Sequence, residues 1–288
     1  MRETFKAACK AGVVILAGGL LIGSLNRTGR QAEAGEHIGS EEKPSGSIRI
    51  AGSTSMEKMS EALAESFMEK YPEVTVTVEY VGSGAGIAAV LSGTADIGNS
   101  SRKLKSGEKA SGAVENIVAL DGIAVCTDPD NKVSGLTRQQ LQDIYTGKIT
   151  DWSQVGGDPF PIVVMGHEAG SGTREPFEAY LQLTGACVYA NELGSAGAVL
   201  ARIAVTPGAI GYVSTQAADK DTAVLEVEGV VPTAETIRAG KYPLVRPFIM
   251  VTNGESGRQI RLIRMWFEYV RGDEGRSVIG KMGLVPAD

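Results

Sequence analysis

Small hydroxyl and glycine residues crowd one point of the chain, between an apolar run and a helical pattern. The apolar run Pro161–Met165 is typical of a buried strand, and the segment GHEAGSGTR follows it at 166–174. Apolar residues then recur at helical spacing. The first N–H groups of a helix have no internal partner, and the macrodipole makes this end positive. The residues Ser171, Gly172 and Thr173 therefore have the chemistry to hold a small oxyanion.

Three more clusters of this kind follow strand-like runs. They are Ser-Thr-Ser-Met at 53–56, which opens a helix running to about Tyr71, Val-Gly-Ser-Gly-Ala-Gly at 81–86, and Asn-Ser-Ser-Arg at 99–102. The alternation of strands, hydroxyl loops and helices predicts an α/β domain with a mainly parallel sheet. Ligands bind such sheets outside the carboxyl ends of the strands. Each cluster alone could be an ordinary turn or cap, but four at one topological position favour a ligand site.

Five of these segments resemble, in order, the phosphate-binding proteins of ABC transporters. The segments are Ala51–Met56, Tyr80–Gly86, Ile97–Arg102, Gly170–Arg174 and Pro207–Ser214. The resemblance covers roughly residues 47–285. It implies a two-lobed type II periplasmic-binding-protein fold, in which each lobe is a mainly parallel sheet flanked by helices. A hinge between the lobes would close on dehydrated inorganic phosphate, which the protein would deliver to an ABC permease in the membrane.

The same resemblance implies a set of ligand contacts on both lobes. In the first lobe they are Ser53, Thr54, Ser55, the Met56 amide, Ser83 and Ser101, and in the second lobe they are His167, Ser171, Gly172 and Thr173.

Two of these positions depart from the family pattern. Ser101 stands where the family often has an acidic residue that accepts the phosphate proton, and His167 stands where it usually has Arg. An Arg side chain is a bidentate and permanently charged fork, whereas His is charged only near or below a pKa of about 6.5. Arg102 or Arg174 could supply the missing charge, and the affinity and the choice of anion stay open.

Two long apolar runs indicate where the chain crosses between lobes. Residues 117–125 read as a strand long enough to cross, and residues 242–251 read as the return strand. The first lobe would therefore be discontinuous, with residues 47–121 and 246–288, and the second lobe would be residues 122–245. We further expect a helix over 136–145 capped by Thr137, and an amphipathic helix over 257–271 that buries Ile260, Ile263, Phe267 and Val270.

The N-terminus has the pattern of an export signal. Three basic residues precede the apolar run Ala11–Leu25, and Ala32-Glu33-Ala34 resembles a cleavage site. We expect residues 1–34 to be a signal peptide or, alternatively, an uncleaved membrane anchor, and residues 35–46 to be a flexible linker. Ser24 stands where a lipobox requires Cys, so no lipid is predicted. The expected location is the periplasm or the outer face of the cell membrane.

Charge and composition exclude several classes of function. The net charge is −6, and removal of residues 1–34 leaves 23 basic against 32 acidic residues. This acidic balance argues against nucleic acid as a partner. Two His residues and no Cys-x-x-Cys motif argue against a metal site, and no cofactor is predicted. Cys126 lies in an apolar run and is expected to be a buried free thiol, although a disulfide with Cys187 is the alternative.

The enzyme interpretations are weaker than the binding interpretation. Ser55 and Lys58 match an S-x-x-K pair, and His167 could act as a base for Ser171. However, the other elements of the acyl-transfer enzymes are missing. We therefore expect no enzyme but a monomeric solute-binding protein for inorganic phosphate. The alternatives are a receptor for another tetrahedral oxyanion such as sulfate, a cell-surface sensor or adhesion module, and, third, a serine hydrolase.

Overall fold

A computed structural model describes residues 43–287, which belong to one compact unit. The predicted signal peptide or anchor and most of the predicted linker lie outside the described residues. None of the helices within 43–287 has the length and apolar character that a membrane crossing requires.

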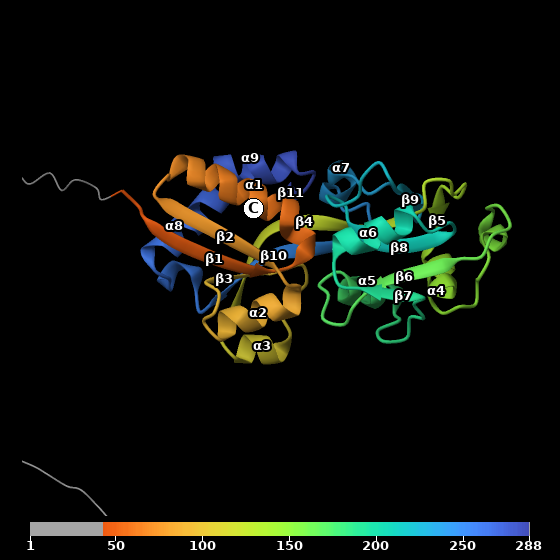
Figure 1. The fold of residues 1–288 in the computed structure, drawn as a ribbon, viewed down its shortest axis with the longest axis horizontal. Coiled ribbons are helices and arrows are strands. Elements are labelled where there is room, and N and C mark those ends of the chain that lie inside the picture. Colours follow the sequence, from red (N-terminus) through yellow and green to blue (C-terminus); the bar gives the residue numbers. More distant parts are fainter. Residues whose placement is uncertain (1–42, 288) are drawn as a thin grey trace, which may run out of the picture. The chain divides into compact units, whose positions relative to one another are not determined.

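The strands pair in the order β2-β1-β3-β10-β4-β8-β6-β7, with β11 and β9 beside β4, and β5 beside β9 (Figure 1). The bounds are β1 Gly46–Gly52, β2 Val74–Tyr80, β3 Ile97–Ser100, β4 Ala113–Thr127, β5 Gly135–Leu136, β6 Val163–His167, β7 Asn191–Leu193, β8 Ala209–Ser214, β9 Ala223–Val227, β10 Val245–Asn253 and β11 Val285–Pro286.

The sheet is mixed, because its two long central strands run against their neighbours. The outer strands pair in parallel on one side (β1 with β2 and β3) and on the other (β6 with β7 and β8). The central strands β4 and β10 are antiparallel to each other. Strand β10 is also antiparallel to β3, and β4 is antiparallel to β8. The expected parallel pairing thus holds on both flanks but not in the centre, where the chain crosses and returns. The register of β10 with β4 shifts between Phe248 and Ile249, which is a β-bulge or an irregularity.

Nine α-helices lie among the described residues, and they follow the strands on both sides of the crossing (Figure 1). They are α1 Glu57–Lys70, α2 Ser83–Leu91, α3 Ser106–Ala110, α4 Arg138–Tyr145, α5 Arg174–Leu181, α6 Ala196–Ala204, α7 Ala234–Arg238, α8 Arg261–Arg271 and α9 Asp273–Lys281. Short 3₁₀ helices cover Thr54–Met56, Trp152–Val155 and Ser256–Arg258.

Local sequence signals place two of these helices well. Thr137 caps α4 by accepting a hydrogen bond from the Gln140 amide, and the Gln140 side chain returns a capping-box contact. In α8 the residues Ile263, Phe267 and Val270 are buried as expected. The predicted start at Gly257 and the inward position of Ile260 are wrong, because α8 starts at Arg261 and Ile260, at the N-cap, is exposed.

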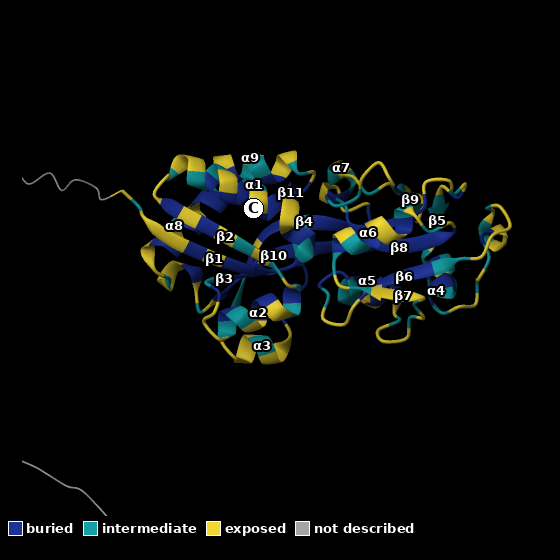
Figure 2. Ribbon diagram, viewed as in Figure 1, coloured by how far each residue is buried: buried dark blue, intermediate teal, exposed yellow. Residues whose placement is uncertain are grey.

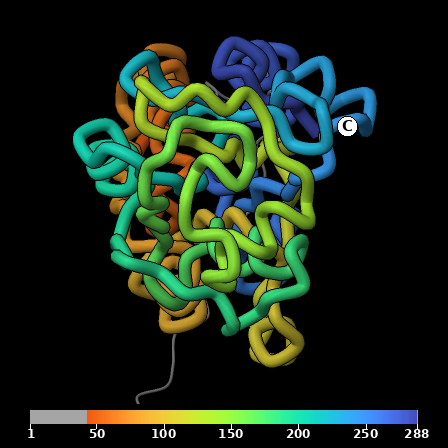
Figure 3. Tube along the Cα trace, turned by 90° about the vertical axis from the view of Figure 1, so that its right-hand side faces the viewer, coloured from red at the N-terminus to blue at the C-terminus, as the bar shows by residue number. Residues whose placement is uncertain are grey.

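Two large apolar cores lie toward opposite ends of the crossing strands. The first packs β1, β2 and β10 against α1, α8 and α9, with Phe67 edge-on to Trp266 at a centroid distance of 5.1 Å. The second surrounds the stacked rings of Phe177 and Tyr212, whose centroids are 3.7 Å apart. Figure 2 shows the strands buried beneath helices with exposed outer faces, and Figure 3 views the molecule from the end that holds the second core.

The crossing strands change core along their length. In β4, Val118 and Ala119 belong to the first core and Ile123 and Val125 to the second. In β10, Phe248 belongs to the first core. The strands therefore pass from one core to the other near residues 120–122 and 245–247, close to the predicted crossing points. The division into lobes stays a prediction.

Helix α2 lies so close to β1 that its fourth residue, Gly86, has no room for a side chain. A Cβ on Gly86 would collide with the Ala51 carbonyl and the Gly52 Cα. We therefore predict that Gly86→Ala lowers the free energy of unfolding by roughly 1–3 kcal/mol. The matched control is Gly280→Ala in α9, which meets nothing within 4 Å and should stabilise the protein by about 0.5–1 kcal/mol. Urea unfolding of both variants measures this, and equal effects would contradict the tight packing of α2.

Candidate anion-binding site

One cavity of about 160 Å³ collects three of the four predicted hydroxyl clusters, from both sides of the crossing. It opens where β1, β2 and β6 end and the following helices begin. Its lining is rich in hydroxyl groups and glycines, and it comprises Ser53, Thr54, Ser55, Val81, Gly82, Ser83, Gly84, Ala85, Glu168, Ala169, Gly170, Ser171, Gly172, Thr173 and Gly194. Segments that are far apart in the sequence therefore form a single polar site.

The first wall of the cavity is the turn between β1 and α1. Ser53 caps the 3₁₀ helix, because its Oγ accepts a hydrogen bond from the Ser55 amide at 3.2 Å. The Met56 amide donates to the Ser53 carbonyl at 3.1 Å, and the Met56 side chain is buried in the first core. Met56 does not line the cavity, so the structure does not place its amide among the groups facing the cavity.

The second wall is the first turn of α2 with the end of β3 behind it. Ser83 and Ser101 are fully buried. The Ser101 amide donates to Ser83 Oγ at 3.1 Å, and Ser53 Oγ donates to Ser101 Oγ at 2.8 Å. Ser101 does not line the cavity itself. It instead supports the two serines that do, and it links the first two clusters of hydroxyl groups.

The third wall is the turn between β6 and α5. Ser171 Oγ accepts a hydrogen bond from the Thr173 amide at 3.1 Å, which shapes the turn. Thr173 Oγ1 lies 2.8 Å from Ser55 Oγ, so it joins this turn to the first wall. Gly172 faces the serines of the second wall, and a Cβ at this position would collide with Ser83 Oγ and Ser101 Oγ. A glycine is therefore required for the walls to approach this closely.

His167 is not at the cavity. It is the last residue of β6, and its ring points into the second core, where Nε2 lies 2.9 Å from the Tyr212 carbonyl. Its side chain is almost fully buried and does not line the cavity. Burial lowers the pKa of His167 to about 4, and the charges of Arg246 and Arg174 act in the same direction. His167 is thus uncharged near neutral pH and supplies no cation to the site.

The two alternative cations are held by carboxylates. Arg102 forms an ion pair with Glu108 at 2.7 Å and another with Glu175 at 3.2 Å. Arg174 forms ion pairs with Glu178 and Glu192 at 2.7 and 2.8 Å. Neither arginine lines the cavity.

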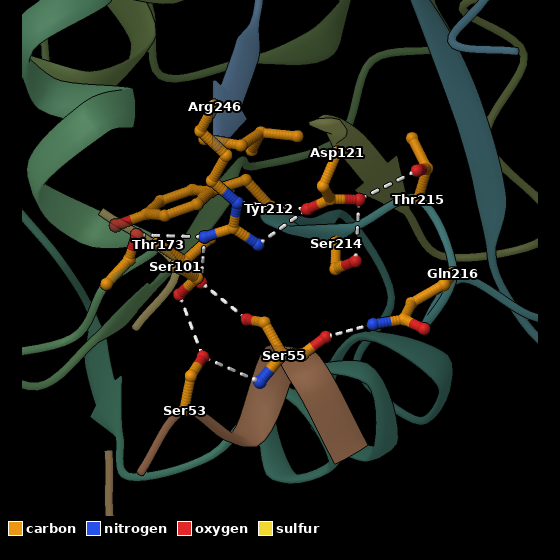
Figure 4. Close-up of polar contacts among 12 residues, drawn as sticks. Ser53, Ser55, Ser101, Asp121, Thr173, Tyr212, Ser214, Thr215, Gln216 and Arg246 are labelled. Carbon is orange, nitrogen blue, oxygen red and sulfur yellow. Dashed lines mark hydrogen bonds and ion pairs between the residues drawn. The ribbon is translucent and has the colours of Figure 1, made fainter. Parts of the chain in front are cut away.

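Sequence reasoning missed a third cation, Arg246 in β10. Its Nη1 donates hydrogen bonds to Thr173 Oγ1 at 2.7 Å and to the Gly172 carbonyl at 2.9 Å, while its other side faces Asp121 of β4 (Figure 4). The available signal was one Arg and one Asp within two strongly apolar strands, because charged residues are rarely buried there without a partner.

The groups named in the enzyme interpretations are engaged elsewhere. Lys58 Nζ donates to the Gln216 carbonyl at 2.9 Å, and Ser55 Oγ pairs with Thr173 rather than with Lys58. His167 contacts the Tyr212 carbonyl and not Ser171. No cluster of His, Cys, Asp and Glu suited to a metal ion occurs within residues 43–287. Cys126 is a buried free thiol, and Cys187 is also free, so the structure has no disulfide between them.

Comparisons with known proteins find similar sequences and similar structures. Residues 39–274 match the family described as the PBP superfamily domain. The chain is 33% identical to the phosphate-binding protein PstS of Bacillus subtilis over 250 residues, which is 85% of this chain and 82% of that protein.

Solved structures agree with the sequence matches. A phosphate ABC transporter substrate-binding protein from Clostridium perfringens, solved with bound phosphate, is similar at a TM-score of 0.81 and 35% identity, over 84% of this chain and 100% of that chain. An ABC-type phosphate transport receptor from Vibrio cholerae is similar at a TM-score of 0.68 and 33% identity, over 83% and 99% of the two chains.

The burial of His167 predicts a pH dependence of stability. Its pKa is about 4 in the folded protein and about 6.5 in an unfolded chain, so the unfolded state binds the proton first as the pH falls. The free energy of unfolding therefore falls as the pH drops below the unfolded pKa, by about 2 kcal/mol between about pH 7 and pH 5. Urea unfolding at both pH values should show this loss in the wild type and not in His167→Gln. Equal losses in the two proteins would show that His167 accepts a proton in the folded state.

Proposed function

Because the chain belongs to the PstS family of phosphate-binding proteins within the PBP superfamily, we propose that it captures inorganic phosphate for an ABC permease. The observation that carries this proposal is the cavity lined by Ser53, Thr54, Ser55, Ser83, Ser171, Gly172 and Thr173. Hydroxyl groups and turn amides can surround a tetrahedral anion with hydrogen bonds while excluding water. The protein acts by binding and release and not as an enzyme.

We place the binding site between two lobes, residues 47–121 with 246–288 and residues 122–245. Three contacts between the proposed lobes support this arrangement. Ser55 Oγ lies 2.8 Å from Thr173 Oγ1, Lys58 Nζ donates to the Gln216 carbonyl, and the Ala196 amide donates to Thr54 Oγ1 at 3.3 Å. An anion that touches both lobes adds to these contacts only in the closed form, so binding shifts the population toward closure.

The place of action is the outer side of the cell membrane, either in the periplasm or tethered to the outer face by residues 1–34. The membrane-bound partner is the permease of a phosphate ABC transporter, because the similar proteins include transport receptors. An oxyanion sensor built on the same fold is the alternative. The function is tested by isothermal titration of the purified protein with phosphate, sulfate and arsenate, and failure to bind phosphate would overturn it.

Thr173 should be the most sensitive hydroxyl group of the cavity. It lies at the start of α5 and contacts both Ser55 and Arg246. Thr173→Val keeps the shape and removes the hydroxyl, and a hydrogen bond to a charged group is worth about 1.5–3 kcal/mol, so phosphate binding should weaken by about tenfold or more. The matched control is Thr77→Val on the exposed face of β2, which should leave the Kd unchanged. An unaltered Kd in Thr173→Val would remove this turn from the site.

Closure should be visible in solution. If the lobes close on phosphate, small-angle scattering should give a smaller radius of gyration at saturating phosphate than without it. Sodium chloride at the same ionic strength controls for salt effects on the profile. Identical profiles with and without phosphate would show that the protein is already closed without ligand, or that capture does not involve a hinge.

A further inference from the structure

Arg246 is a buried guanidinium in the apolar first part of β10, between Val245 and Pro247. Its side chain is 1% exposed, and it stands opposite Asp121, which is fully buried, in the register of β10 and β4. The Arg246 Nε and Nη2 atoms each lie 2.9 Å from Asp121 Oδ2. A charge so far from water is costly unless it is paired. Asp121 supplies that pairing on one side of the guanidinium.

The other side of the guanidinium faces the cavity turn. Nη1 donates to Thr173 Oγ1 (Figure 4) and also to the Gly172 carbonyl. An arginine can only donate, so Thr173 must accept from it. The Thr173 hydroxyl proton is therefore free to point away from Arg246, toward Ser55 and the cavity. Arg246 thus makes Thr173 a hydrogen-bond donor at the place where an anion would lie.

The carboxylate of Asp121 is fixed on its far side as well. It accepts hydrogen bonds from Ser214 Oγ at 2.8 Å and from Thr215 Oγ1 at 2.9 Å. Both hydroxyl groups hold the negative end of the pair away from the cavity. The pair is thus an oriented dipole whose positive end touches the turn of Gly172 and Thr173. Because the surroundings are buried, such a dipole acts on an anion more strongly than it would in water.

We propose that Arg246 is the positioning residue that gives this site its positive potential, acting through Thr173 and Gly172, and that Asp121 sets the strength of that potential as a counter-ion. This inference rests on the proposed function, since it assigns the charge that holds the captured anion. The sequence suggested His167 as the cation of the site, and this inference assigns that role to Arg246, which lies on a different strand. The ligand class remains a small tetrahedral oxyanion.

The test compares the two partners of the pair. Arg246→Met removes the cation and leaves a buried carboxylate, whereas Asp121→Asn removes the counter-charge and leaves the cation. A role in anion binding predicts opposite changes: phosphate should bind at least about tenfold more weakly to Arg246→Met and at least as tightly as wild type to Asp121→Asn. A merely structural pair predicts that both variants weaken binding. Titration calorimetry gives the Kd values, and urea unfolding gives the stability of each variant.

The double variant tests the role of Arg246 even if the single variants fail to fold. Removing both members of a buried ion pair is far less damaging than removing one, so Arg246→Met with Asp121→Asn should fold, and it should still bind phosphate at least about tenfold more weakly than wild type. The matched control is the surface pair of Arg49 with Asp96, 3.2 Å apart, whose side chains are 53% and 27% exposed. Its neutral double variant, Arg49→Met with Asp96→Asn, should leave the Kd unchanged.

The outcomes separate this inference from the proposed function. Wild-type affinity in the folded Arg246→Met/Asp121→Asn protein would overturn the role of Arg246 while phosphate capture stands. Weakened binding in a folded Asp121→Asn protein would also overturn it. If the wild-type protein binds neither phosphate, sulfate nor arsenate, the proposed function and this inference fall together.

Discussion

The ion pair of Arg246 and Asp121 lies where three parts of the structure meet. It joins the two long antiparallel strands near the point at which they pass from one apolar core to the other. It also bonds the turn between β6 and α5 through Thr173 and Gly172. Burial opposes the charge of both groups, lowering the pKa of Arg246 and raising that of Asp121, and each is countered by the charge of its partner. The strands, the turn and the cavity therefore depend on one electrostatic contact.

The local parts of this structure could be predicted from the sequence, because their signals are local. Hydroxyl clusters after apolar runs indicated the strand ends that line the cavity, and Thr137 indicated the start of α4. These signals depend on backbone groups that lack partners at helix ends. The same reasoning located Ser53–Ser55, Ser83 and Ser171–Thr173 in a single cavity, although their role in binding is a proposal.

The misplaced features depend on contacts between residues that are distant in the sequence. His167 lies beside the turn in sequence, but the alternation of side chains along β6 turns its ring toward Tyr212 in the second core. The partner of Arg246 is 125 residues away, so no local pattern connects the two. The crossing and return strands were predicted from their apolar runs, but their antiparallel pairing was not, because it joins residues as far apart as Asp121 and Arg246. Ile260 was misplaced for a smaller reason: α8 starts at Arg261, four residues after the predicted start at Gly257.

The continuous strands β4 and β10 also bear on the mechanics of the protein. Two hydrogen-bonded strands resist bending far more than a loop does, so a change of angle between the halves would be absorbed as torsion distributed along the ribbon. The shifted register between Phe248 and Ile249, two residues past Arg246, is the place where the ladder is already irregular and its twist easiest to alter. If the proposed lobes rotate against each other, the change of twist would concentrate at this step, so the joint would be a seam within a continuous sheet rather than a loop.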